Sequence, residues 1–144
     1  MQMEINELYH KFRKEGRGVG HAQWCVGLRC LHGNEVKRDL DKAEEWFLKA
    51  WDNKFPGTAN TQAFVLKRRW ERFISAAFQE TPRVKALLIG ANTLSNEQHG
   101  IIIIPTHNDA QKEWLNDRIE EMVAAFRQFT NDCFISISIF TVVW

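Results

Sequence analysis

Apolar residues recur at helical spacing in three segments of the first 58 residues. The stripe of the first segment consists of Ile5, Leu8, Tyr9 and Phe12. A second segment, 21–33, closes at Gly33, because glycine readily takes the left-handed conformation that ends many helices. A third, 39–53, begins with Asp39 or Asp41 as its N-cap. The pattern predicts an all-helical first lobe of residues 1–58.

Beyond the turn-rich stretch 53–62 the pattern becomes mixed. The predicted helices are 61–80, 82–89 and 108–129, the last with Asn108 as N-cap and Gln111 as its capping-box partner. The predicted strands are a short one after residue 90, the isoleucine run 101–104, and a final strand with period-two alternation, in which Ile135, Ile137 and Ile139 face one side and Ser136 and Ser138 the other. The sequence therefore predicts an α+β fold: a helical hairpin lobe, then an α-α-β-β-α-β domain of residues 59–144 with a small three-stranded sheet.

The run of four isoleucines, Ile101 to Ile104, raises the question of which side of the sheet each of them faces. In a sheet covered by helices on one side, alternate residues face the core, so two of the four must face the other side. We expect Ile102 and Ile104 to be the pair that meets a partner surface. That surface is the first lobe, which we prefer, or a second copy of the chain in a homodimer, or another protein.

Composition narrows the class of protein. The chain has 144 residues, of which 44% are hydrophobic and 26% charged, with a net charge of +1. This balance is typical of a globular protein, and no bulk charge attracts it to nucleic acid or to acidic membranes. The isoleucine run is much shorter than the roughly 20 apolar residues that cross a bilayer. Three cysteines and a start without the apolar core of a secretory signal predict a reducing compartment, the cytoplasm.

Two clusters invite a chemical interpretation. His21, Cys25, Cys30 and His32 contain zinc-ligand residue types, but Cys30 rotates away from the first pair and no paired CxxC is present, so buried thiols explain them better. His107 and Asp109 follow a strand, where sites often lie, but Asp109 suits a helix N-terminus. We expect no metal, no cofactor and no catalytic residue.

The basic cluster of the chain consists of Lys67, Arg68, Arg69 and Arg72. As an alternative function, it predicts a KH-like protein that binds single-stranded nucleic acid. The KH fold uses a GxxG loop between two helices, and residues 82–89 contain none. We therefore interpret the basic cluster as the solvent-exposed face of a helix, without a nucleic-acid partner.

The stretch "HAQWCVGLRCLHGNEVKRDLDKAEEWFLKAW", residues 21–51, resembles a Sel1-like repeat, a relative of the tetratricopeptide helical hairpin. The likeness rests on small residues at the helix crossing, among them Gly27 and Ala43, and on the aromatic pair Trp46 and Phe47. The resemblance implies a scaffold for protein interactions and no chemistry.

Residues 62–144 resemble the amino-terminal, KH-like domain of the bacterial replication initiator DnaA. The likeness rests on Trp70 in the first helix, on Pro82 before the second, on "IIIIPTHNDAQKEWL" and on the final apolar strand. This resemblance implies binding to proteins: self-association, and contact with the replicative helicase and regulators.

The resemblance can be carried over at three positions. Trp70 occupies the place of the family's tryptophan used for self-association. We give equal weight to a role in the core and a role in an interface. The family's acidic helicase contact falls near Lys85, a reversal of charge, and an aromatic residue of the family is replaced near Ala110. We therefore expect a non-enzymatic interaction module or adaptor, linked to replication initiation or to a mobile element, whose partners include the initiator or the helicase.

Overall fold

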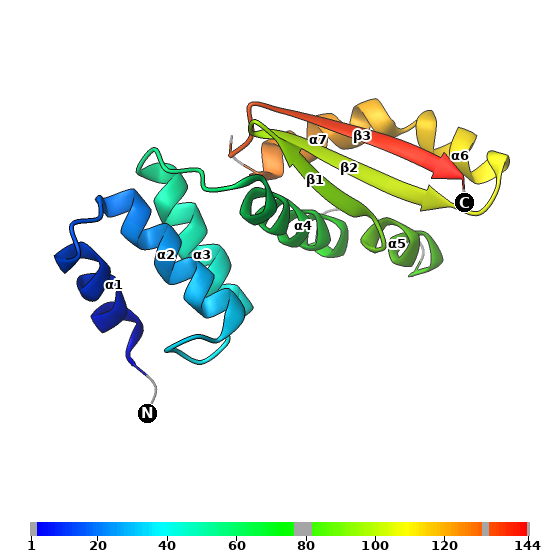
Figure 1. Cartoon of the computed structure of the whole chain (residues 1–144). Helices are drawn as coiled ribbons and strands as arrows, with labels where there is room; N and C mark the ends of the chain where they lie inside the picture. Colours follow the sequence, from blue (N-terminus) through cyan, green and yellow to red (C-terminus); the bar gives the residue numbers. More distant parts are fainter. Residues whose placement is uncertain (1–2, 77–81, 131–132, 144) are drawn as a thin grey trace. The chain divides into compact units, whose positions relative to one another are not determined.

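The computed structural model describes residues 3–76, 82–130 and 133–143. The chain forms two compact units, Met1–Thr61 and Gln62–Trp144 (Figure 1). The first is helical, and the second combines helices with a small mixed sheet, so the predicted α+β class is confirmed. The predicted boundary between residues 58 and 59 coincides with the start of helix α4 at Ala59, and the boundary between the compact units lies three residues later.

The first unit contains α1 (Ile5–Lys14), α2 (Val19–His32) and α3 (Leu40–Asp52). Gly33 ends α2 with φ at 72°, and the Asp39 carboxylate accepts a hydrogen bond from the backbone N–H of Lys42 at 3.1 Å, as expected of an N-cap. The two helices pack closely because Gly27 faces the ring of Phe47, where an added Cβ would lie 2.6 Å from two ring carbons.

The second unit begins with two helices, α4 (Ala59–Ala76) and α5 (Pro82–Ile89). Strands β1 (Asn92–Asn96) and β2 (His99–Thr106) follow as a hairpin. Helices α6 (Asp109–Asn116) and α7 (Ile119–Thr130) then lead to β3 (Ser136–Val143). Residues 77–81, where the first of these helices was expected to end, lie outside the described part of the chain.

The helix predicted over residues 108–129 is in fact two helices. It breaks at Asp117 and Arg118, immediately after Asn116. The side-chain oxygen of Asn116 accepts a hydrogen bond from the Thr141 hydroxyl of β3 at 2.8 Å. Asn and Asp side chains compete with the helical backbone for hydrogen bonds, so the break occurs where α6 is tied to the sheet.

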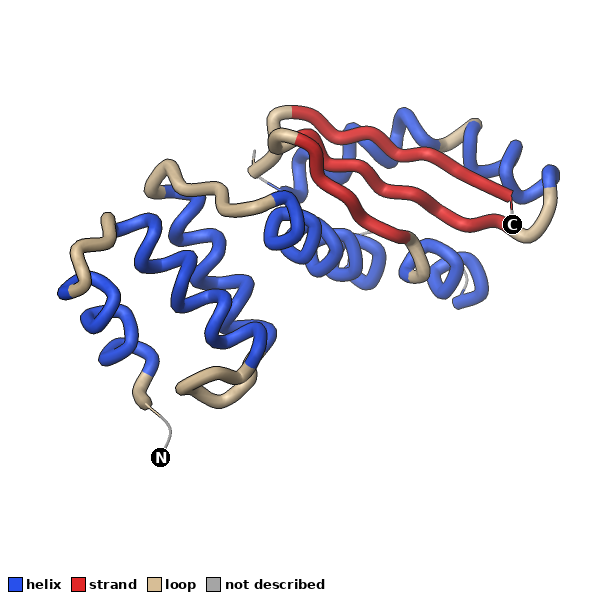
Figure 2. The backbone as a smooth tube through the Cα atoms, viewed as in Figure 1, coloured by secondary structure: helices blue, strands red, loops and turns tan. Residues whose placement is uncertain are grey.

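The sheet has the order β1-β2-β3, with β1 antiparallel and β3 parallel to the central strand (Figure 2). Burial alternates along the two longer strands. The buried side consists of Ile102, Ile104, Thr106, Ile137, Ile139 and Thr141. The opposite side, which we call the open face, includes Leu94, Ile101, Ile103, Ser138 and Phe140. Leu94 and Phe140 are 51% and 53% exposed, so one side of the sheet carries the core.

The prediction that Ile102 and Ile104 face a partner surface was therefore wrong. Ile102 and Ile104 are fully buried in the core, and Ile101 and Ile103 are the pair on the open face. The final strand differs in one position too: Ile135 precedes β3 and is 78% exposed, whereas Ile137 and Ile139 are buried as expected.

An aromatic cluster joins the helices of the second unit. The rings of Trp70 and Phe126 meet edge to face at 5.2 Å between centroids, and Phe73 lies 5.3 Å from Phe126. Trp70 and Phe126 are fully buried and Phe73 almost so. Edge-to-face contacts of this kind stabilise a core beyond the area that they bury. Among the described residues, no helix has both the length and the apolar character needed to cross a membrane.

Candidate functional site: a groove between α5 and α6

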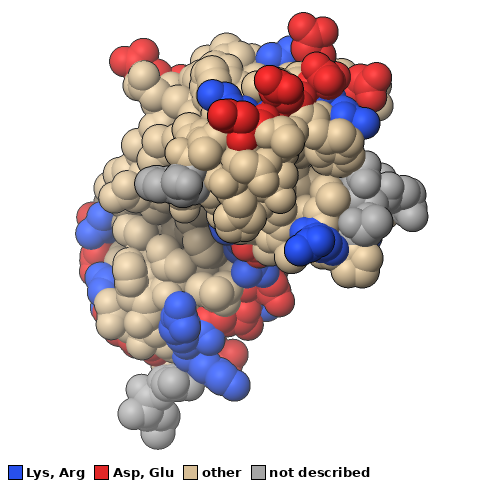
Figure 3. Space-filling model, turned by 90° about the vertical axis from the view of Figure 1, so that its right-hand side faces the viewer, with Lys and Arg blue, Asp and Glu red and all other residues tan. Residues whose placement is uncertain are grey.

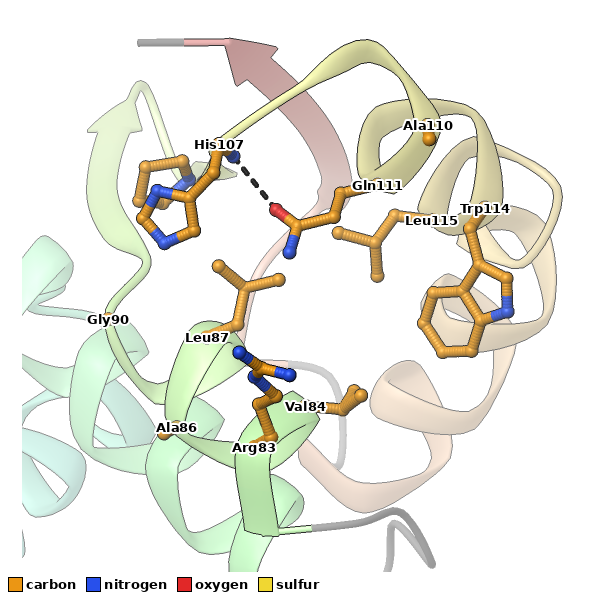
Figure 4. Close-up of a pocket in the computed structure, with 11 residues that line it drawn as sticks. Arg83, Val84, Ala86, Leu87, Gly90, His107, Ala110, Gln111, Trp114 and Leu115 are labelled. Atoms are coloured by element: carbon orange, nitrogen blue, oxygen red, sulfur yellow. Dashed lines mark hydrogen bonds between the residues drawn. The ribbon is translucent and has the colours of Figure 1, made fainter.

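A groove of about 660 Å³ opens between α5 and α6 in the second unit (Figure 4). Both helices line it with residues spaced by one helical turn. The α5 wall consists of Arg83, Val84, Ala86 and Leu87, with Gly90 just beyond it. The α6 wall consists of Ala110, Gln111, Trp114 and Leu115. Pro105 near the end of β2 and His107 in the turn before α6 complete the lining. This volume and mainly apolar lining are typical of sites that bind a ligand or an inserted side chain.

Local sequence signals place the two walls. Pro82 begins α5, where its missing N–H costs nothing. The side chain of Asn108 accepts a hydrogen bond from the Gln111 N–H at 2.9 Å and so begins α6. The Gln111 side chain in turn accepts one from the His107 N–H at 2.8 Å (Figure 4). This reciprocal cap fixes the turn from which the His107 side chain projects.

The groove is apolar in its floor and basic at one wall. Leu87 extends from α5 into the space between the walls, toward His107 and Gln111 (Figure 4). Arg83 is exposed in the first turn of α5. Neither its guanidinium nor the His107 imidazole bonds to any described residue, and no described lining residue is acidic. Both groups are available to a ligand.

Trp114 provides a large, fixed surface on the α6 wall. The guanidinium carbon of Arg118 lies 3.9 Å from the centre of its ring, and the same guanidinium donates to the Trp114 carbonyl oxygen at 2.6 Å. These two contacts hold the half-buried indole in one orientation beside the groove. Tryptophan and arginine are enriched where protein interfaces concentrate their binding energy.

Of the five positions predicted to bind a partner, two belong to this region. Ala110 lines the groove and is exposed, and Lys85 is half-buried on α5 between two lining residues. Trp70 is fully buried, and its indole N–H donates to the carbonyl oxygen of Leu88 at 2.7 Å, which makes it a core residue. Ile102 and Ile104, as shown above, are core residues as well.

The basic cluster of α4 does not form one continuous surface. The Lys67 ammonium donates to the carbonyl oxygens of Ile89, at 2.8 Å, and of Ala91, so it caps the end of α5. Arg69 donates to the Thr130 carbonyl oxygen at 3.3 Å, at the end of α7. Arg68 packs its guanidinium 5.9 Å from the Phe64 ring centre, and Arg72 is exposed. Lys67 and Arg69 thus serve contacts within the second unit.

The other predicted clusters stay apart in space or are internal. His107 lines the groove, whereas Asp109 is exposed on α6 outside it. Within the described ranges, no group of three or more His, Cys, Asp or Glu residues is placed to hold a metal ion. Cys25 and Cys30 are buried, and burial raises the pKa of both thiols above the ordinary value. Arg17, whose guanidinium lies 3.5 Å from the Cys25 sulfur, opposes part of the rise in the Cys25 pKa.

Sequence reasoning did not find Arg83, Leu87 and Trp114 as site residues. Each was assigned, by its spacing, to the helix that bears it. A signal was present in the sequence: residues 83 and 87 on one helix and 110 and 114 on the other are each one helical turn apart, on one side of their helix. That the two stripes face each other depends on the tertiary fold.

Comparison of the chain with protein-family models, with curated proteins and with solved structures finds no match.

Proposed function

We propose that this protein is a non-enzymatic protein-interaction module of the cytoplasm, and that its second unit binds a partner protein in the α5–α6 groove. The observation that carries the proposal is the groove itself: an open, mainly apolar depression whose walls are helix faces. Such surfaces are typical of protein sites that receive an apolar anchor.

The resemblance to the DnaA amino-terminal domain supports the same location. Lys85 and Ala110, which the resemblance assigned to partner contact, lie on the two walls of the groove or between lining residues. On this basis we propose that the partner belongs to replication initiation or to a mobile element, with the initiator and the replicative helicase as first candidates. The basic Lys85, in place of an acidic residue, favours a different complementary surface on that partner.

The first unit supports a scaffold role. Its α2–α3 hairpin, with Gly27 packed on Phe47, carries the residues that resemble a Sel1-like repeat, a unit that implies protein contacts. The nucleic-acid alternative receives less support, because Lys67 and Arg69 donate to backbone carbonyl oxygens within the second unit. Cations held in this way contribute less to a phosphate-binding surface.

The test is affinity capture of the tagged full chain from lysate of its own host, with and without nuclease, and mass spectrometry of the retained proteins. Ala110→Glu places a charge in the groove at an exposed position in the first turn of α6, where an acidic residue is tolerated. Ala124→Glu makes the same change at an exposed position of α7 outside the groove.

The proposal predicts nuclease-resistant retention of specific proteins that is lost with Ala110→Glu and kept with Ala124→Glu. Recovery of the initiator or helicase among them would support the pathway as well. Retention of proteins that depends wholly on nucleic acid would contradict the proposal. So would a set of proteins that is identical for both variants.

A further inference from the structure

The charges around the groove bear on the chemistry of its partner. This inference rests on the proposed function, that the groove binds a protein, and goes further by naming what kind of segment enters it. The described lining residues include one permanent cation, Arg83, and one imidazole, His107, but no carboxylate. The α5 wall is therefore electropositive over an apolar floor.

Two features add to the positive character of that wall. The Arg83 guanidinium has no ion-pair partner among the described residues, so its charge is not neutralised within the unit. It stands in the first turn of α5, at the end of the helix that carries partial positive charge.

The α6 side of the groove carries charges of both signs. Asp109 and Glu113 are exposed on α6 but do not line the groove, and the Arg118 guanidinium lies on the Trp114 ring of the same wall. Along the top of the view in Figure 3, Asp and Glu side chains lie among Lys and Arg side chains. The charge that lines the groove itself is therefore that of Arg83, on the α5 wall.

The length of the groove walls matches a short helix. The walls are two eight-residue helices, and a helix of that length extends about 12 Å, or two turns. Along two turns a partner helix presents apolar side chains at i, i+3 or i+4, and i+7. Val84, Leu87 and Trp114 provide the surfaces on which such anchors pack.

We propose that the groove binds an amphipathic helix of a partner protein, with its apolar face on Leu87 and Trp114 and with acidic side chains on the flank that meets Arg83. Charge complementarity then determines which flank of the partner helix faces α5. A carboxylate on that flank accepts hydrogen bonds from the planar guanidinium of Arg83, which is suited to bidentate pairing.

The test is a selection of displayed helices on the immobilised full chain. A stable helical carrier protein displays one surface helix with leucine fixed at i, i+3, i+4 and i+7. The positions on both flanks vary among Glu, Lys and Gln. Selected clones are then measured against wild type, Arg83→Glu and Arg72→Glu. Arg72 is exposed on α4 outside the groove, so its reversal is the matched control.

The inference predicts that Glu is enriched on one flank of the selected helices. Their affinity is about tenfold lower for Arg83→Glu, within about twofold of wild type for Arg72→Glu, and weaker at higher salt. Exchange of Glu for Lys on that flank restores binding to Arg83→Glu.

Enrichment of Lys or Gln, binding that ignores Arg83→Glu, or the absence of any binding clone would each overturn the inference. None of these results decides the proposed function, because capture of the native partner and its loss in Ala110→Glu are measured separately. If a native partner is retained but presents no acidic helix to the groove, the proposed interaction module is supported and the inference of a helical partner is overturned.

Discussion

The indole N–H of Trp70 donates to the carbonyl oxygen of Leu88 across 2.7 Å, and both residues are fully buried. This bond joins the middle of α4 to the last turn of α5, the helix that forms one wall of the groove. Trp70 therefore acts on any partner through the position of α5. Its side chain has no exposed surface with which to make a contact of its own.

Replacement of Trp70 tests this relationship. Trp70→Ala removes a buried ring and its hydrogen bond, so we expect a loss of about 3–5 kcal/mol in the free energy of unfolding of the second unit. Trp70→Phe keeps most of the ring and should lose less, about 1–3 kcal/mol. Denaturant unfolding followed by circular dichroism measures both. A Trp70→Ala protein whose free energy of unfolding equals that of wild type would contradict this role of Trp70 in the core.

The finding that alternate isoleucines of β2 face the core can be tested at two adjacent positions. Ile104→Thr buries a hydroxyl in the core and should cost about 2–4 kcal/mol, whereas Ile103→Thr, on the open face, should cost less than about 1 kcal/mol. The substitutions are chemically identical, so each is the control for the other. Equal losses would mean that both sides of β2 are covered.

Lys67 should contribute to stability, in contrast to a solvated cation. It caps α5 through the carbonyl oxygens of Ile89 and Ala91. We expect Lys67→Ala to lower the free energy of unfolding by about 1 kcal/mol, since hydrogen bonds from charged groups exceed those from neutral ones. Lys37→Ala, at an exposed lysine of the first unit that bonds to no described residue, should change it by less than about 0.5 kcal/mol. The reverse order, measured by thermal unfolding, would contradict the capping role.

The contact between Gly27 and Phe47 predicts coupling within the first unit. Gly27→Ala brings a methyl group against the ring of Phe47, so we expect a loss of about 1–3 kcal/mol. Phe47→Leu relieves the contact, and the double variant should lose less than the sum of the two single variants. Losses that simply add in a double-mutant cycle would refute the steric cause.

The raised pKa values of Cys25 and Cys30 predict slow reaction with thiol reagents and a dependence of stability on pH. Burial keeps both thiols protonated in the folded state at pH values where the unfolded thiols ionise, so stability should fall as the pH rises above the ordinary thiol range. Labelling with a maleimide at neutral pH should modify the half-buried Cys133 first. Persistence of a fast phase in Cys133→Ser would contradict this order.

Several elements were predicted correctly because their signals are local. Asn108 begins α6 through a bond to the next turn, and Gly33 ends α2 in the left-handed conformation. The alternation of Ile137 and Ile139 with serines placed the core side of the last strand. In each case the deciding contact lies within a few residues of the signal.

The failures concern contacts between distant segments. Four isoleucines in a row contain no alternation, so the buried pair depends on the register of β2 against its neighbours and on Gly100, which packs against Leu66 of α4. The break at Asn116 accompanies a bond to β3, 25 residues later. The groove itself exists only once α5 and α6 lie side by side. The spacing of residues within either helix does not predict that the two helices form the walls of one groove.

Hydrogen exchange of the full chain, alone and with a protein retained in the capture experiment, tests the central claim most directly. The proposed site predicts slower exchange on binding in residues 82–90 and 105–115, the two walls of the groove, with little change in β1 or in residues 67–72. Protection confined to the strands or to the basic segment of α4, with residues 82–90 unchanged, would contradict the assignment of the groove as the binding site.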